Sequence, residues 1–264
     1  MELELIADKA ITITKRAGAF IREEATKFER AAVEHKGFND LVSYVDKQAE
    51  KILVEGLSDL LPESGFIAEE GTSTKKGELY NWIIDPLDGT TNFIHGIPTY
   101  SVSVALQRNQ ETILGIVYEI NRDECFYATA HGKAFLNGNI LQIDQNIKLA
   151  ESLIATGFPY NNFDKVDGYL AILKEVMQHS HGLRRIGSAA VDLAYVACGR
   201  FEGFFEYNLN AWDVAAGAFI VQQSGGTVSA FHENKSAIFD GEIIAAAPLV
   251  HEALISTIQK KWKA

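Results

Sequence analysis

The spacing of hydrophobic residues predicts two long helices at the start of the chain. Over the first thirty residues, apolar side chains recur at steps of three and four with charged residues between them, which is typical of an amphipathic helix. The same period runs from Leu41 to Leu61, where Pro62 ends it. We therefore expect a pair of helices over the first sixty residues.

After Pro62 the pattern changes to short runs with strand character. These runs cover residues 66–68, 80–84, 101–107, 112–120 and 124–129. In the third run Val102, Val104 and Leu106 alternate with smaller residues, which predicts a sheet with two unlike faces. Gly132 and the pair Asn137-Gly138 mark a hairpin after these strands.

The second half of the chain mixes both kinds of element. Strands are predicted at 152–156, 201–206 and 243–247, and helices at 163–177, 188–197, 214–223 and after Pro248. No repeat and no linker rich in proline or serine divides the chain. We therefore expect a single domain over residues 1–264 with two lobes, roughly 1–148 and 149–264, in a layered α+β fold.

Composition and charge exclude several classes of protein. Hydrophobic residues make up 47% and charged residues 22% of the 264 residues, which is typical of globular proteins. The formal net charge of −11 argues against nucleic-acid binding. The uncharged run Ile243–Val250 is too short to span a membrane, and the first ten residues lack a signal-peptide pattern, so we expect a cytoplasmic protein. Two cysteines, Cys125 and Cys198, form neither a disulfide framework nor a zinc motif.

Carboxylates follow several of the apolar runs. They are Glu69, Glu70, Asp85, Asp88 and Asp213. If several of them converge, each like-charged pair at 4 Å costs about 4 kcal/mol at an effective dielectric of 20, so the cluster must take up protons or bind metal. Oxygen ligands without clustered histidine or cysteine select Mg²⁺, Mn²⁺ or Ca²⁺, and no EF-hand pattern favours calcium. Magnesium would also let an acidic protein bind a phosphate ester.

The segment Asp88–Asn92, with the sequence Asp-Gly-Thr-Thr-Asn, allows two interpretations. An Asp-Gly pair by itself predicts a hairpin turn. The following Thr-Thr-Asn can instead begin a short helix, whose free backbone N–H groups form a site for phosphate. In that case the hydroxyl group of Thr90 lies beside the carboxylates and can orient a water molecule.

Two segments carry a resemblance to a known family. Residues 85–93 (Asp-Pro-Leu-Asp-Gly-Thr-Thr-Asn-Phe) resemble the first signature of the inositol monophosphatases, and residues 212–217 (Trp-Asp-Val-Ala-Ala-Gly), with Gly225-Gly226, resemble the second. The family's other acids match Glu69-Glu70 and the series Lys36, Asp40 and Asp46. The resemblance covers nearly the whole chain. It implies an alternating α-β-α-β-α layered sandwich of the inositol monophosphatase and fructose-1,6-bisphosphatase type, and a homodimer.

The resemblance also implies roles for individual residues. The ligands of two or three Mg²⁺ ions, which Mn²⁺ can replace, would be Glu69, Asp85, Asp88, Asp213 and the backbone carbonyl of Leu87. The catalytic residues would be Thr90, hydrogen-bonded to Asp46 and activating water, with Glu70 as a supporting acid. The substrate-binding residues would be Gly89, Thr90 and Thr91 at the phosphate and Gly187, Ser188, Ala189 and Glu206 at the leaving group.

The implied function is a lithium-sensitive, Mg²⁺-dependent phosphatase that hydrolyses inositol-1-phosphate. NADP(H), fructose-1,6-bisphosphate and 3′-phosphoadenosine 5′-phosphate are alternative small phosphorylated substrates, and Tyr160, Phe163, Arg184 and Arg185 are candidates for contacts to a nucleotide. A regulatory binding protein that has the fold without catalysis is an alternative of a different class. Two positions depart from the family pattern: Ser43 replaces a threonine and keeps its hydroxyl group, and Asn210 replaces a histidine of some relatives.

Overall fold

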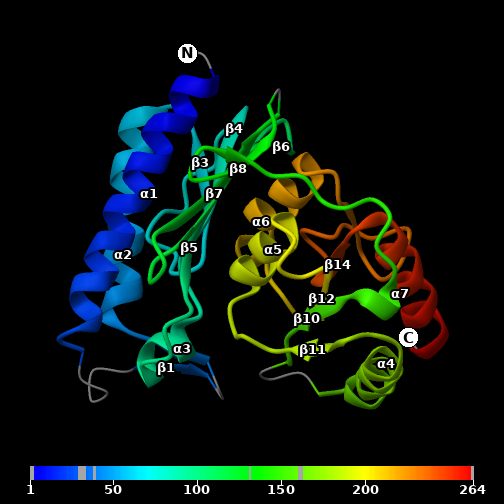
Figure 1. Cartoon of the computed structure of the whole chain (residues 1–264). Helices are drawn as coiled ribbons and strands as arrows, with labels where there is room; N and C mark the ends of the chain where they lie inside the picture. Colours follow the sequence, from blue (N-terminus) through cyan, green and yellow to red (C-terminus); the bar gives the residue numbers. More distant parts are fainter. Residues whose placement is uncertain (1–2, 29–33, 38–39, 131, 160–162, 263–264) are drawn as a thin grey trace.

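The protein is built from five alternating layers of helices and sheets (Figure 1). The computed structural model describes residues 3–28, 34–37, 40–130, 132–159 and 163–262. From one side to the other, the layers are a helix pair, a seven-stranded sheet, a second helix pair, a five-stranded sheet and a third helix pair. This order confirms the α-β-α-β-α sandwich expected from the resemblance.

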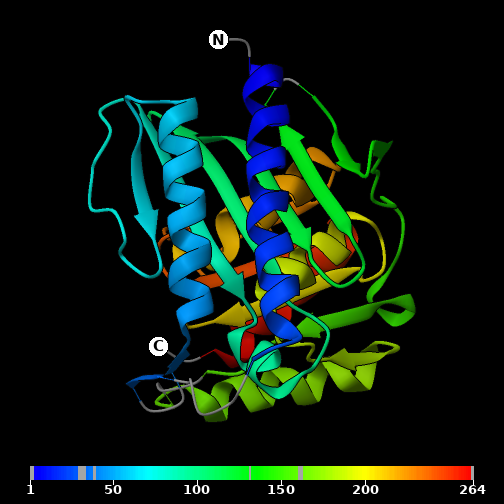
Figure 2. The same ribbon diagram turned by 90° about the vertical axis from the view of Figure 1, so that its left-hand side faces the viewer.

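The first layer consists of α1 (Leu3–Ala25) and α2 (Tyr44–Leu60), which lie side by side across one face of the larger sheet (Figure 2). The prediction that the second helix starts at Leu41 was wrong. Residues Asp40–Val42 form strand β2, which pairs with β1 (Glu34–Gly37). The helix starts later because Ser43 is its N-cap, with an extended backbone and a side chain that accepts a hydrogen bond from the N–H group of Val45.

The seven-stranded sheet follows the chain order from β3 to β9, with β3 parallel to β4 and the other pairs antiparallel. Its strands are β3 (Gly65–Ala68), β4 (Tyr80–Asp88), β5 (Ser101–Arg108), β6 (Glu111–Glu119), β7 (Glu124–Thr129), β8 (Ala134–Leu136) and β9 (Asn139–Ile140). The predicted hairpin turn is confirmed, because Asn137 and Gly138 connect β8 to β9 with φ angles of 48° and 83°.

The two faces of this sheet differ as the alternation in β5 predicts. Val102, Val104 and Leu106 belong to the apolar cluster under α1 and α2. The opposite face carries small residues, and a Cβ atom added to Gly115 would lie 2.7 Å from the carbonyl oxygen of Ala216 in the facing helix. The small side chains therefore let that helix pack closely against this face of the sheet.

The central layer and the second sheet come from the second half of the chain. Helices α5 (Ala189–Ala197) and α6 (Ala211–Gln223) lie between the sheets. The five-stranded sheet has the order β11-β10-β12-β14-β13, with strands β10 (Leu153–Thr156), β11 (Gly182–Arg184), β12 (Gly203–Tyr207), β13 (Thr227–Ser229) and β14 (Glu242–Ala246). Helices α4 (Val166–His179) and α7 (Pro248–Lys261) cover its outer face, and two short helices, α3 (Thr90–His95) and the 3₁₀ helix Leu149–Glu151, complete the fold.

One apolar cluster joins the two halves of the chain. It contains Ile83 and Phe126 from the first sheet together with Phe204 and Ile244 from the second. The division into two lobes therefore stays a prediction, since both halves contribute to this core. No helix among the described residues has the length and apolar character needed to cross a membrane.

Candidate active site

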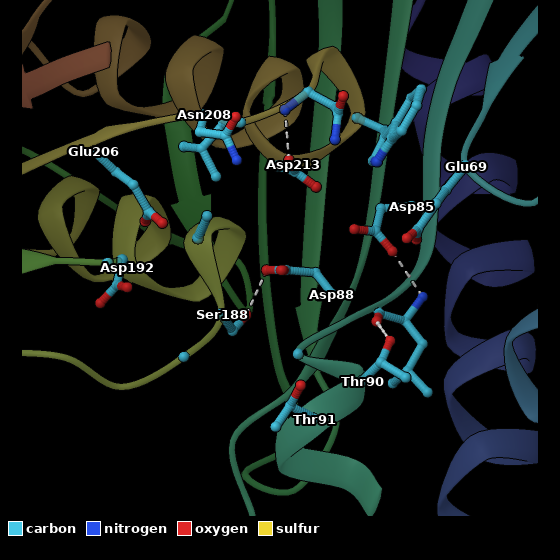
Figure 3. Close-up of a pocket in the computed structure, with 18 of the residues that line it drawn as sticks. Glu69, Asp85, Asp88, Thr90, Thr91, Ser188, Asp192, Glu206, Asn208 and Asp213 are labelled. Atoms are coloured by element: carbon cyan, nitrogen blue, oxygen red, sulfur yellow. Dashed lines mark hydrogen bonds between the residues drawn. The ribbon is translucent and has the colours of Figure 1, made fainter. Parts of the chain in front are cut away.

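A cavity of about 300 Å³ opens where β4, β12 and the N-terminal ends of α3, α5 and α6 meet (Figure 3). Its lining is Glu69, Asp85, Leu87, Asp88, Gly89, Thr90, Thr91, Gly157, Arg185, Gly187, Ser188, Ala189, Asp192, Glu206, Asn208, Leu209, Asn210, Trp212 and Asp213. The segments of both predicted signatures therefore meet at one site, although they are more than a hundred positions apart in the sequence.

Three aspartates form the centre of this cavity. Asp85 and Asp88 lie at the end of β4, and Asp213 lies in the first turn of α6. One carboxylate oxygen of each lies within 4.8 Å of the others. Side chains three positions apart in a regular strand face opposite sides, but the pairing of β4 with β5 shifts register between Asp85 and Asp88, so both side chains reach the cavity.

Backbone N–H groups orient each of these carboxylates. Asp85 accepts a hydrogen bond from the N–H of Leu87 at 2.9 Å, and Asp213 accepts one from the N–H of Asn210 at 2.6 Å. Asp88 Oδ2 accepts hydrogen bonds from the N–H of Ala190 at 2.7 Å and from the hydroxyl group of Ser188 at 2.5 Å. Ser188 is the N-cap of α5 and Ala190 lies in its first turn, so the second half of the chain holds an acid of the first half in place.

Burial of this cluster disfavours its negative charge. Burial raises the pKa of Asp88 to about 6 and that of Asp213 to about 7. Burial also raises the pKa of Asp85 well above its usual value, and the charges of Glu69, Asp88 and Asp213 raise it further. The side chains of this cluster offer only oxygen atoms as metal ligands, so the cluster fits a hard divalent cation such as Mg²⁺. The charge of the cation would compensate for the repulsion between the carboxylates.

Thr90 connects the cavity to a buried acid of α2. Its hydroxyl group lies 2.8 Å from Asp46 Oδ1 and 2.9 Å from the carbonyl oxygen of Leu87. A hydroxyl group carries one hydrogen, so it donates to one of these acceptors at a time. Asp46 Oδ2 accepts hydrogen bonds from the N–H and hydroxyl groups of Ser43, which explains how serine serves at this departure from the family pattern.

Glycine and threonine give the loop before α3 its shape. Gly89 has a φ of 98°, a left-handed conformation that favours glycine, and α3 begins at the next residue. Of the two interpretations of the Asp-Gly-Thr-Thr-Asn segment, the short helix is therefore confirmed. Thr91 lines the cavity beside Thr90, so the beginning of α3 faces the site where phosphate binding was predicted.

The opposite wall of the cavity carries a second pair of acids, Asp192 in α5 and Glu206 at the end of β12. Burial raises the pKa of both well above their usual values, and the charge of Glu206 raises that of Asp192 further. Among the described residues, Asp192 Oδ1 has no hydrogen-bond partner. A Cβ atom added to Gly157 would lie 2.0 Å from Glu206 Oε1, so only glycine leaves room for this carboxylate.

Most of the predicted site residues meet in this cavity, and a few do not. Asp46 joins it through Thr90, whereas Glu70 is not among the lining residues. The N–H group of Glu70 donates to Glu50 Oε2 at 2.7 Å, and a catalytic role for Glu70 stays a prediction. Of the four candidates for contacts to a nucleotide, Arg185 lines the cavity, Arg184 and Phe163 do not, and Tyr160 lies outside the described residues. The side chains of Lys36 and Asp40 also lie outside the described part.

Four lining residues were missed in the sequence: Gly157, Asp192, Asn208 and Leu209. Asp192 interrupts the apolar run Ala189–Ala197, and an acid in such a run is the same signal that identifies Asp85 and Asp213. Asn208 gives no such signal, because it is a polar residue after β12 and not an acid within an apolar run.

The chain is similar to known proteins over nearly its whole length. The model of the Inositol monophosphatase family matches residues 2–263. Inositol-1-monophosphatase of Mesorhizobium japonicum is 38% identical over 250 residues, which are 94% of each chain. Nus factor SuhB of Pseudomonas aeruginosa is 38% identical over 255 residues, which are 95% of this chain and 94% of that protein.

Solved structures of similar proteins have the same fold. The extragenic suppressor protein suhB from Bartonella henselae superposes with a TM-score of 0.90 at 35% identity, over 97% of this chain and 99% of that chain. The inositol monophosphatase from Anabaena superposes with a TM-score of 0.88 at 31% identity, over 99% and 98%.

Proposed function

Because the chain belongs to the inositol monophosphatase family, we propose that it is a Mg²⁺-dependent phosphatase that hydrolyses inositol-1-phosphate to myo-inositol and phosphate. One observation carries this proposal: Asp85, Asp88 and Asp213 converge in the same cavity as the hydrogen-bonded pair Thr90 and Asp46. An acid cluster suited to cations and a hydroxyl group coupled to a carboxylate are the two parts that metal-assisted hydrolysis requires.

The metal ions would be held by Glu69, Asp85, Asp88, Asp213 and the carbonyl oxygen of Leu87. When bound, Mg²⁺ supplies positive charge that offsets the charge on phosphate and makes water a better nucleophile. The N–H groups at the start of α3 face the same space and bind the phosphate oxygens. Together they place the phosphorus atom in front of Thr90.

Thr90 and Asp46 orient the attacking water and receive its proton. When Thr90 donates its hydrogen to Asp46 Oδ1, a lone pair of the threonine oxygen is directed to a water in the cavity. Ser43 fixes the other oxygen of Asp46, so this carboxylate is held in one orientation. The carbonyl of Leu87 then remains available as a metal ligand.

The charge of the cavity supports a leaving group that carries no second phosphate. The lining residues include six acids, Glu69, Asp85, Asp88, Asp192, Glu206 and Asp213, and one basic residue, Arg185. A bisphosphate or dinucleotide would place further negative charge beside Glu206 and Asp192. Among the described residues, Arg185 is the one basic lining residue that can offset this charge. A neutral polyol such as inositol avoids this repulsion and offers hydroxyl groups to both acids.

Phosphate release with and without EDTA tests the proposal. The substrates are inositol-1-phosphate, fructose-1,6-bisphosphate, NADP and 3′-phosphoadenosine 5′-phosphate, each with Mg²⁺ or Mn²⁺. We expect the largest kcat/KM for inositol-1-phosphate, its loss in EDTA and inhibition by lithium that depends on the Mg²⁺ concentration. A larger kcat/KM for any of the other three compounds would identify that compound as the substrate in place of inositol-1-phosphate.

Several relatives are named Nus factor, which favours a second role as a binding protein. The complete set of acids favours catalysis in addition to any such role. Folded protein that released no phosphate from any of these esters with Mg²⁺ would favour a binding function alone.

We also propose that the chain is a homodimer, which light scattering of the purified protein tests.

A further inference from the structure

Asn208 has a backbone conformation that its position in the fold makes unusual. Its φ is 64°, in the left-handed region. Among the described residues, four others that are not glycine have a positive φ: Asn109, Gln110, Asp123 and Asn137. Those four lie in the turns of the hairpins formed by β5–β6, β6–β7 and β8–β9, where such a conformation is expected. Asn208 instead follows β12, in the wall of the active-site cavity.

Asn208 lies just beyond the end of β12, two positions after Glu206. Both residues line the active-site cavity. Tyr207, between them, packs in the opposite direction, with its ring 4.8 Å from that of Tyr169 and 4.9 Å from that of Trp262. Glu206 is buried, whereas Asn208 is exposed, so Asn208 lies nearer the opening (Figure 3).

Asn208 and Glu206 offer different chemistry to a leaving group. The asparagine amide is both a hydrogen-bond donor and an acceptor, and it carries no charge. A ring with several hydroxyl groups presents donors and acceptors along one edge, whereas an aryl or small alkyl leaving group does not. A neutral amide at the opening therefore suits the outer edge of a polyol.

We propose that Asn208 is a specificity-determining residue, whose amide hydrogen-bonds to hydroxyl groups on the outer edge of a polyhydroxylated leaving group. This inference rests on the proposed phosphatase function. The contact lies far from the phosphorus atom and forms equally in the bound substrate and the transition state. Its loss therefore raises KM and leaves kcat nearly unchanged.

The variant Asn208→Gly tests this proposal, because glycine adopts a positive φ without strain and removes the side chain that carries the amide. Asn109→Gly, at a left-handed asparagine in the β5–β6 turn, is the matched control. Each protein is assayed with inositol-1-phosphate and with 4-nitrophenyl phosphate, whose leaving group has no additional hydroxyl. We expect Asn208→Gly to lower kcat/KM for inositol-1-phosphate about three- to tenfold through KM, and to change that for 4-nitrophenyl phosphate less than about twofold.

Asn208→Asp is a second variant that keeps the size of the side chain and replaces the neutral amide with a carboxylate, which only accepts hydrogen bonds and adds a negative charge. It is expected to lose activity toward inositol-1-phosphate as well. Equal effects of Asn208→Gly on both substrates, or no effect on either, would overturn this inference and leave the phosphatase function intact. If the unmodified protein hydrolysed 4-nitrophenyl phosphate only, the phosphatase chemistry would stand and the role of Asn208 would be overturned. Inactivity toward both substrates would overturn both proposals.

Discussion

The two walls of the cavity hold their acids in different ways. On the wall formed by β4 and α6, each of Asp85, Asp88 and Asp213 accepts a hydrogen bond from a backbone N–H group. On the opposite wall, Asp192 Oδ1 has no partner among the described residues, and Glu206 lies against the bare Cα of Gly157. The first wall is oriented by backbone hydrogen bonds and the second by packing.

This difference indicates that the two walls have different roles in the site. Backbone donors cannot be changed by substituting their own side chains, so the geometry of the acid cluster is fixed by the fold. The positions of the acids on the other wall depend on the size of the neighbouring side chains, so single substitutions can reshape that wall. We therefore expect changes at the first wall to act on kcat and changes at the second to act on KM and on the choice of substrate.

The largest effect is expected from Asp88→Asn. The amide keeps the shape of the side chain and an oxygen for the donors on α5, but it removes an anionic metal ligand. We expect kcat/KM for inositol-1-phosphate to fall by about a thousandfold or more. In EDTA at pH 8 the variant should melt at a higher temperature than the unmodified protein, because one repelling charge is gone.

Asp59→Asn is the control for this variant, since Asp59 is an exposed acid on α2. It should change kcat/KM less than about twofold. Turnover by Asp88→Asn within about tenfold of the unmodified protein would contradict the assignment of Asp88 as a metal ligand.

Thr90→Ala should have the next largest effect. Removing the hydroxyl group separates the water from Asp46, and positioned proton transfer contributes about 10²- to 10⁴-fold to rates. We expect kcat to fall by at least about a hundredfold with little change in KM, measured by phosphate release at saturating substrate. Thr90→Ser keeps the hydroxyl group and should retain most of the activity. A loss confined to KM would show that Thr90 only binds substrate.

Gly157→Ala acts on the second wall. The added Cβ would lie 2.0 Å from the Glu206 carboxylate, which must move from its present position. We expect KM for inositol-1-phosphate to rise about tenfold and the inhibition constant of inorganic phosphate to stay the same, because phosphate occupies the first wall only. An equal weakening of both would mean that the substitution disturbs the whole site and not this wall alone.

The amount of this structure that the sequence predicts depends on the length of each pattern. The period of α1 extends over many turns, and β5 is eight residues long with a clear alternation from Ser101 to Leu106, so both were predicted. Strands β11 and β13 have three residues each, which is too short for a period to be recognised. The β1–β2 hairpin was missed because Leu41 extends the apolar period of α2 backward, and the capping role of Ser43 outweighs that period.

The same distinction applies to the site. Asp85, Asp88 and Asp213 were found because an acid next to an apolar run is visible in the sequence, and their roles came from the resemblance to a family. The donors that orient them are backbone N–H groups, which every residue except proline has, so no pattern marks them. Asn208 was missed for a related reason, because a single polar residue after a strand is common and no apolar run marks it.

The smallest expected effect is a pH-dependent stabilisation of the fold by Mg²⁺. It distinguishes the acids of the first wall in their protonated form from the same acids in their charged form. Asp88 and Asp213 have pKa values raised to about 6 and about 7 from an ordinary value of 3.8. A carboxyl group with a raised pKa stabilises the fold while it is protonated, so this contribution is complete below about pH 4 and is lost as the pH rises through 6 to 7. Mg²⁺ binds the deprotonated form, so its stabilising effect should grow over the same interval.

We expect the difference in melting temperature between 10 mM Mg²⁺ and EDTA, measured by calorimetry, to be about 3–6 °C larger at pH 8 than at pH 5. Asp88→Asn should reduce this increase, and an equal difference at both pH values would mean that the cluster does not bind the ion.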